Sequence, residues 1–156
     1  MSELLQAVYR GDQARADELL AGDPELDVFE AAAVGRTDRL HELLDEDPSL
    51  ANAWADDGFQ PLGLASFFGH VESARLLLER GADVNSASRN DFKVAPLHSA
   101  VAEKDADVRY ELATLLLEHG ADPNARQQDD FTPLMAADQQ EDERLRALLV
   151  EHGARD

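Results

Sequence analysis

The stretch LLLERGADVN, residues 76–85, decides the fold of this chain. It returns as LLLEHGADPN at residues 115–124, and a shortened copy, LLVEHGA, occupies residues 148–154. Leucines followed by Gly are typical of the end of a buried helix, because Gly adopts the left-handed conformation that satisfies the last carbonyls. Asp and Asn after the Gly suit the turn that follows. Three copies of one helix ending indicate an internal repeat.

A second motif precedes each copy. It reads PLGLAS from Pro61, PLHSAV from Pro96 and PLMAAD from Pro133. Pro is favoured at the first position of a helix, where its missing N–H is not needed. Each unit is therefore predicted to contain a helix that begins at Pro, a turn, and a Leu-rich helix that ends at Gly. The middle copy carries four extra residues, which we place in the turn between its helices, residues 102–109.

With Thr132-Pro133-Leu134, Pro96-Leu97-His98 and Gly69-His70, these motifs resemble the ankyrin repeat, in which a turn and two helices recur every 33 residues. The resemblance covers nearly the whole chain. It implies an all-α solenoid of five stacked repeats with β-turn fingers, in units 1–26, 27–53, 54–86, 87–125 and 126–156. The chain looks like the small free-standing ankyrin proteins of bacteria.

The two ends of the stack are expected to differ from its middle. The first unit is short, and a plain loop is predicted between it and the second, because only 24 residues separate Gly11 from Gly35. The last unit is predicted to be a polar cap, as the ends of a stack of repeats must be. Its run from Gln139 to Arg144 is expected to be solvated surface.

Composition limits the classes of function. Among 156 residues, 33 are acidic and 14 are Lys or Arg, which gives a formal net charge of −19. Such a charge disfavours nucleic acid and anionic membranes, both of which attract basic surfaces. The chain has no Cys, and hence no disulfide and no cysteine-based metal site. No segment reads as a membrane span or signal peptide, so we expect a cytoplasmic protein.

Residues capable of catalysis are better explained by the repeat. The resemblance implies that His70 and His98 form hydrogen bonds between loops and repeats. No spacing fits a zinc site, a phosphate loop or a dinucleotide site. Paired carboxylates are inevitable among 33 acids. We therefore predict no catalytic residue, cofactor or metal. A carboxylate-based hydrolase stays open as an alternative, and it would require a deep pocket with perturbed acids.

The resemblance implies a protein-binding surface on the concave face, made by the finger tips and by the residues before each turn between helices. Carried onto this sequence, the predicted partner-binding residues are Tyr9, Arg10, Val34, Trp54, Asp56, Asp57, Phe59, Phe67, Phe68, Asn90, Asp91, Phe92, Glu103, Asp129, Asp130 and Phe131. We call this set the concave stripe. It should have an aromatic centre and an acidic rim.

Within the concave stripe, Phe67 and Trp54 are the aromatic residues expected to be exposed. Because exposed aromatics often anchor protein interfaces, these two are the expected anchors. Phe68 is expected to pack under its finger. Phe59 and Phe131 precede equivalent prolines and are expected to be shared packing elements. The resulting prediction is a non-catalytic protein-binding module. The alternative is an acidic inhibitor or immunity-type protein that neutralises a basic partner.

Overall fold

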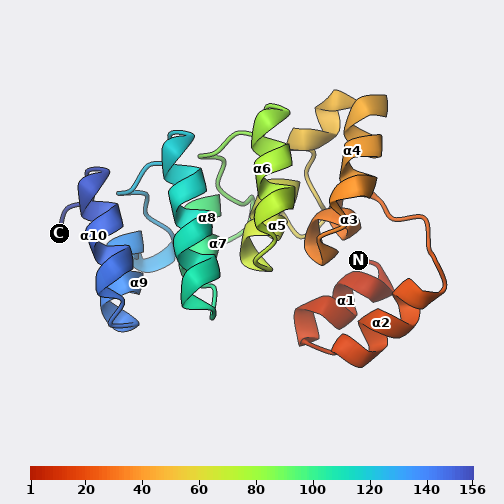
Figure 1. Ribbon diagram of the computed structural model, residues 1–156, viewed down its shortest axis with the longest axis horizontal. Helices are drawn as coiled ribbons and strands as arrows, with labels where there is room; N and C mark the ends of the chain where they lie inside the picture. The colour runs from red at the N-terminus through yellow and green to blue at the C-terminus, as the bar shows by residue number, and fades with distance from the viewer.

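The computed structural model describes residues 1–156 and contains helices but no strands (Figure 1). This confirms the predicted all-α solenoid, whose fingers are loops closed by backbone hydrogen bonds. The helices are α1 (Glu3–Arg10), α2 (Gln13–Ala21), α3 (Val28–Val34), α4 (Thr37–Glu46), η1 (Pro48–Asn52), α5 (Pro61–Phe67), α6 (Val71–Glu79), α7 (Pro96–Val101), α8 (Ala106–Glu118), η2 (Gln128–Asp130), α9 (Pro133–Gln139) and α10 (Glu143–Glu151).

The two sequence motifs define the helix boundaries as predicted. Helices α5, α7 and α9 begin at their prolines. Helix α6 ends just before Gly81, whose φ of 91° is left-handed, and Ala82 N–H donates to Leu77 O at 2.9 Å to close the helix end. The same arrangement ends α8 and α10, because their sequences carry the same Gly.

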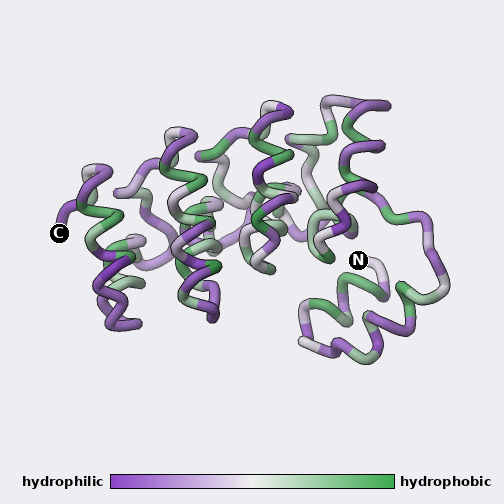
Figure 2. Tube along the Cα trace, viewed as in Figure 1, coloured by the Kyte–Doolittle hydropathy of each residue, from purple (hydrophilic) through white to green (hydrophobic).

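Buried leucines and alanines hold successive helix pairs together. Leu44, Leu77, Leu116 and Leu149 occupy equivalent positions of the outer helices, and each is fully buried. Small residues on the inner helices, such as Ala65, are also fully buried and let neighbouring pairs approach closely. Figure 2 shows hydrophobic residues along the helices and hydrophilic residues in many of the turns. Each buried CH₂ contributes about 0.8 kcal/mol to stability.

The stack is regular only from α3 onward. Outer helices α4, α6, α8 and α10 form one row, and inner helices α3, α5, α7 and α9 form a second (Figure 1). The first pair, α1 and α2, lies out of this row and contacts the rest mainly through α1 and α3. Residues 22–27, between α2 and α3, form a loop without helix or strand, in keeping with the predicted plain loop.

An asparagine ladder joins the helix pairs along one edge. Asn52, Asn85 and Asn124 each donate from Nδ2 to the carbonyl of the Gly that ends the next outer helix, at 2.9–3.0 Å. Each also accepts, through Oδ1, a backbone N–H two residues beyond that Gly, at 2.8–3.0 Å. Each asparagine therefore fixes the distance between two neighbouring units.

The four extra residues lengthen a helix, so the prediction of a longer turn is wrong. Helix α8 has 13 residues, whereas α6 and α10 have 9 each. Four residues make about one helical turn. The Asp105 side chain starts this added turn by accepting the backbone N–H groups of Asp107 and Val108.

The added turn carries Arg109, whose side chain is only 7% exposed. Its Nε and Nη2 donate to Asp142 at 3.0 and 2.7 Å, and its Nη1 donates to Glu103 O and to Gln140 Oε1. Solvated surface is therefore the wrong prediction for Asp142, because its side chain is 10% exposed and pairs with Arg109. The last helix pair is attached to the one before it through this buried ion pair.

Candidate functional site

Three fingers project from the loops between helix pairs: the first is residues 54–60, the second residues 86–95 and the third residues 127–132. Backbone hydrogen bonds join each finger to the next. In the first finger, Ala55 N–H donates to Phe59 O at 2.8 Å. Arg89 N–H of the second finger donates to Gly58 O at 2.8 Å. Gly58 has φ +89°, and a Cβ there would lie 2.7 Å from Arg89 O. Only glycine allows this approach of the two fingers. The second and third fingers are linked by Gln128 N–H and Phe92 O, at 2.9 Å.

Trp54 is not the freely exposed aromatic that was expected. It is half-buried at the base of the first finger, and the guanidinium carbon of Arg89 lies 3.8 Å from the centre of its ring. A guanidinium over an indole face is a favourable cation–π contact. Arg89 therefore covers part of the Trp54 ring.

The aromatic centre of the concave stripe is a cluster of Tyr9, Phe67 and Phe68. The Phe67 and Phe68 rings meet edge to face at 4.9 Å, and Tyr9 lies 5.4 Å from Phe68 and 6.5 Å from Phe67. Phe67 is 47% exposed, as expected, while Phe68 is half-buried between its neighbours. The cluster joins α1 to α5 and presents Phe67 to solvent.

Tyr9 ties this cluster to the first finger. Its hydroxyl donates to Asp57 Oδ2 at 2.8 Å, and Asp57 Oδ1 accepts the N–H of Phe59. Burial raises the pKa of Tyr9, and the hydrogen bond with Asp57 and its negative charge raise it further. Asp57 thus has a structural role within the stripe.

The second and third fingers carry a second exposed aromatic. Phe92 is 59% exposed and lines a groove of about 330 Å³ with Phe131 and Asp129. Phe131 and Phe59 are half-buried against the core, in keeping with their expected packing role. Asn90 shapes the second finger, because its Oδ1 accepts from Ser88 Oγ and Phe92 N–H.

The remaining residues of the concave stripe are mostly polar. Arg10, Asp56, Asp91 and Asp130 are exposed, and Val34 is half-buried. Glu103, also half-buried, accepts the backbone N–H groups that follow it, those of Lys104 and Asp105. The structure thus gathers the stripe into two aromatic areas, at Phe67 and at Phe92, with acidic finger tips beside them.

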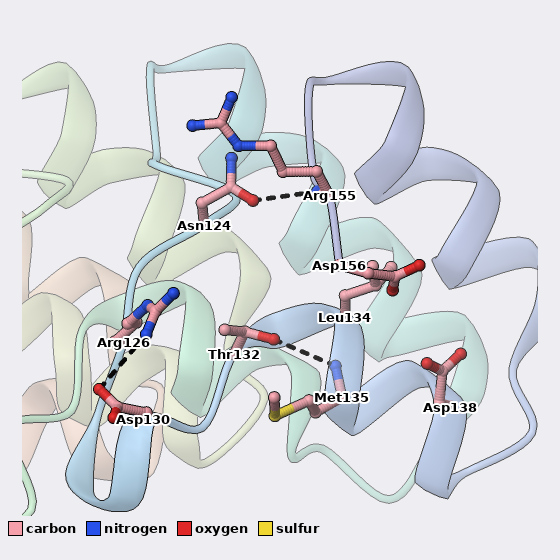
Figure 3. Close-up of a pocket in the computed structure, with 9 residues that line it drawn as sticks. All are labelled: Asn124, Arg126, Asp130, Thr132, Leu134, Met135, Asp138, Arg155 and Asp156. Carbon is pink, nitrogen blue, oxygen red and sulfur yellow. Dashed lines mark hydrogen bonds and ion pairs between the residues drawn. The ribbon is translucent and has the colours of Figure 1, made fainter.

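Another hollow runs along α9, from Thr132 to Asp138, and takes in Arg155 and Asp156 near the C-terminus (Figure 3). It measures about 410 Å³. Arg126 pairs with Asp130 within it at 3.5 Å, and Asp138 and Asp156 pair with Arg146, which does not line it. Met135, which lines it, is 47% exposed. Met135 occupies the position of His98 in the previous unit, but His98 is buried, so counting residues from the prolines does not predict the exposure of Met135. Because its charges are largely compensated, this hollow is a weaker candidate site than the concave stripe.

The two family histidines have the predicted structural role. His98 Nε2 lies 3.0 Å from Ala125 O, and its Nδ1 accepts the N–H of Ala95. His70 Nε2 lies 3.0 Å from Ala33 O. Burial lowers the pKa of both imidazoles, against hydrogen bonds to backbone carbonyls that raise it. The structure holds no cluster of three His, Cys, Asp or Glu side chains able to bind a metal. Its helices are too short and too polar to cross a membrane.

Comparison with known proteins agrees with this architecture. A family model described as ankyrin repeats in three copies matches residues 28–127, well over half of the chain. The DNA-binding protein RFXANK from Homo sapiens is 38% identical over 85 residues, which are 53% of this chain and 33% of that protein. Ankyrin repeat and SAM domain-containing protein 6 from Mus musculus is 39% identical over 59 residues, 38% of this chain and 7% of the relative.

A third relative is an enzyme, but its similarity is confined to a small part. The serine/threonine-protein kinase VIK from Arabidopsis thaliana is 43% identical over 61 residues, 39% of this chain and 14% of the kinase, and its kinase domain is not matched. The chain spans a third or less of the length of these relatives. All three are eukaryotic, so a bacterial source stays a prediction. By its repeats, its helix pairs and this match, the chain belongs to the ankyrin-repeat family.

Proposed function

We propose that this chain is a non-catalytic module that binds a protein partner through the concave stripe. Ankyrin repeats generally mediate protein–protein interaction. The observation that carries the proposal is the exposed Phe67, 47% accessible and supported from behind by Phe68 and Tyr9. A rigid, partly exposed aromatic side chain is the kind of residue that anchors an interface. Phe92 supplies a second anchor on the second finger.

The charge of the surface favours a basic partner. Asp56, Asp91, Asp129 and Asp130 are exposed at the finger tips beside the aromatic residues. The chain as a whole carries a formal charge of −19. Complementary charge speeds association and selects among partners. This feature also supports the second candidate, an acidic inhibitor or immunity-type protein acting in the cytoplasm. No observation favours a carboxylate-based hydrolase.

The proposal is tested by affinity capture of a partner from a native lysate of the source organism. Phe67→Glu should abolish capture, because it places a charge where an aromatic side chain would be buried. Val150→Glu is the matched control, since Val150 is 50% exposed on α10, outside the concave stripe. Circular dichroism must show both variants folded. Equal capture by the two variants would refute the stripe as the binding surface.

The salt dependence of partner binding distinguishes the two candidate functions. Raising ionic strength from 0.1 to 1 M shortens the Debye length from about 10 to 3 Å. An interaction anchored by aromatic residues should survive this change with little loss of affinity. By contrast, the affinity of an acidic inhibitor for a basic partner should fall strongly, because salt screens the charges between them.

A further inference from the structure

The first finger has one side that no other finger covers. The second finger bonds to the first through Gly58 O, and the third bonds to the second through Phe92 O. Residues 22–27, which connect the first two helix pairs, form only a short loop and supply no finger. The open side of the first finger therefore faces α1 and α3 across a pocket of about 210 Å³. Its lining residues are Met1, Ser2, Leu5, Asp27, Phe29, Trp54, Ala55, Asp56 and Asp57.

The pocket combines apolar walls with negative charge. Leu5, Phe29 and Trp54 supply the walls, and the three lining carboxylates face no lysine, arginine or histidine of the lining. Asp27 is engaged in capping α3, and Asp57 accepts from Tyr9. Asp56 is exposed and makes no hydrogen bond within the protein. An apolar stem ending in a cation matches these walls and this free carboxylate.

The contact between Arg89 and Trp54 shows that the Trp54 ring can bind a guanidinium. Its guanidinium lies 3.8 Å over the ring, and no carboxylate of the protein lies within ion-pair distance of it. Arg89 does not line the pocket, so the pocket opens on a part of Trp54 that Arg89 leaves uncovered. A guanidinium is planar, stacks on aromatic rings and pairs with carboxylates through two N–H groups, which an ammonium cannot do.

We propose that this pocket binds the side chain of one arginine in a basic segment of the protein partner. The inference rests on the proposed function and specifies the partner's chemistry. The size of the pocket agrees, because about 210 Å³ is below the roughly 300–1,000 Å³ of small-molecule sites and well above the roughly 30 Å³ of one water. The stem of the arginine packs between Phe29 and Trp54, and its head meets Asp56.

The test uses the peptide acetyl-Gly-Arg-Gly-amide and nuclear magnetic resonance of the intact chain. Trp54 is the single tryptophan, so its indole N–H gives one resolved signal. That signal and the Leu5 methyl and Phe29 ring signals should shift and saturate with the peptide. The same peptide with citrulline, a neutral analogue of arginine, should leave them unchanged.

Two matched variants locate the charge. Asp56→Asn should weaken binding of the arginine peptide roughly fivefold, the upper range for a partly exposed ion pair. Asp38→Asn removes the same charge from an exposed position on α4, outside the concave stripe, and should leave binding unchanged. Equal binding by the two variants, equal shifts with citrulline, or shifts that omit Leu5 and Phe29 would each overturn the proposal.

Failure of this pocket is distinguishable from failure of the proposed function. A partner lost with Phe67→Glu but bound with unchanged affinity by Asp56→Asn would leave Phe67 as the anchor of the interface and refute the pocket. Peptide binding that depends on Asp56, together with a partner unaffected by Phe67→Glu, would support the pocket and refute Phe67 as the anchor.

Discussion

Asp142→Asn removes the charge opposite the buried guanidinium of Arg109 while preserving the size of the side chain. Asn can still cap α10 by accepting the N–H of Leu145, as Asp142 does at 3.0 Å. The two charged side chains are 7% and 10% exposed. Breaking a pair this deeply buried costs about 3–5 kcal/mol. Arg109 keeps Glu103 O and Gln140 as partners, so we expect the lower end, about 3 kcal/mol.

Thermal and urea unfolding followed by circular dichroism measure this loss. For a chain of this length, about 3 kcal/mol lowers the midpoint temperature by roughly 6–12 °C. The matched control is Asp138→Asn, which breaks the exposed pair with Arg146 and should cost less than about 1 kcal/mol. The double variant Arg109→Met/Asp142→Asn should recover much of the stability, because it leaves no unpaired buried charge. Equal losses for Asp142→Asn and Asp138→Asn would refute the argument.

Acid should weaken the same contact. Burial by itself raises the pKa of Asp142, but the N–H of Leu145 and the charge of Arg109 outweigh it and lower that pKa below its ordinary 3.8. The unfolded chain then binds the proton first. The stability contributed by this pair is therefore complete above pH 3.8 and is lost as the pH falls through the lower, folded-state pKa.

Three further predictions concern other parts of the stack. Because burial lowers the pKa of His98 below 6.5, its contribution is complete above pH 6.5 and decreases as the pH falls through the folded-state pKa. His98→Gln should flatten the dependence of the urea midpoint on pH between 7.5 and 5, and an unchanged slope would contradict this. Gly58→Ala should cost about 1–3 kcal/mol more than Gly81→Ala in urea unfolding, since both have left-handed φ but only Gly58 faces backbone, at Arg89. Equal costs for the two variants would contradict the close contact between the first and second fingers. Ser99→Ala should raise stability by about 1 kcal/mol, because the buried Ser99 hydroxyl has no hydrogen-bond partner; a lower melting temperature would contradict this.

Local sequence determined the parts of the fold that depend on a single residue's conformation. Pro61 begins a helix because its ring fixes φ and lacks an N–H, and Gly81 ends one because it adopts a φ of 91°. The role of His98 was also predictable, since a repeat brings the same position against the same neighbouring loop each time. The exposure of Phe67 could be predicted because Phe67 is the last residue of α5, just before the turn between the two helices of its unit.

Departures from the repeat were harder to predict, because repetition supplies no information about them. The sequence predicts a longer turn from the four extra residues, but they form an added helical turn that buries Arg109 against Asp142, a partner 33 residues away. Trp54 seemed free in the sequence, yet Arg89 crosses to it from the next finger. Nothing in the sequence indicated a site at Phe29, because its pocket forms only on the side of the first finger that no other finger covers.

The sequence by itself therefore determined the helix pairs, their boundaries and the membership of the ankyrin-repeat family, because caps, prolines and leucine spacing act within a few residues. Tertiary structure alone decided that Arg89 covers Trp54, how α1 and α2 tilt away from the stack, and which carboxylates lack a partner. Burial and pairing depend on side chains that approach from other units, and no local pattern specifies those approaches.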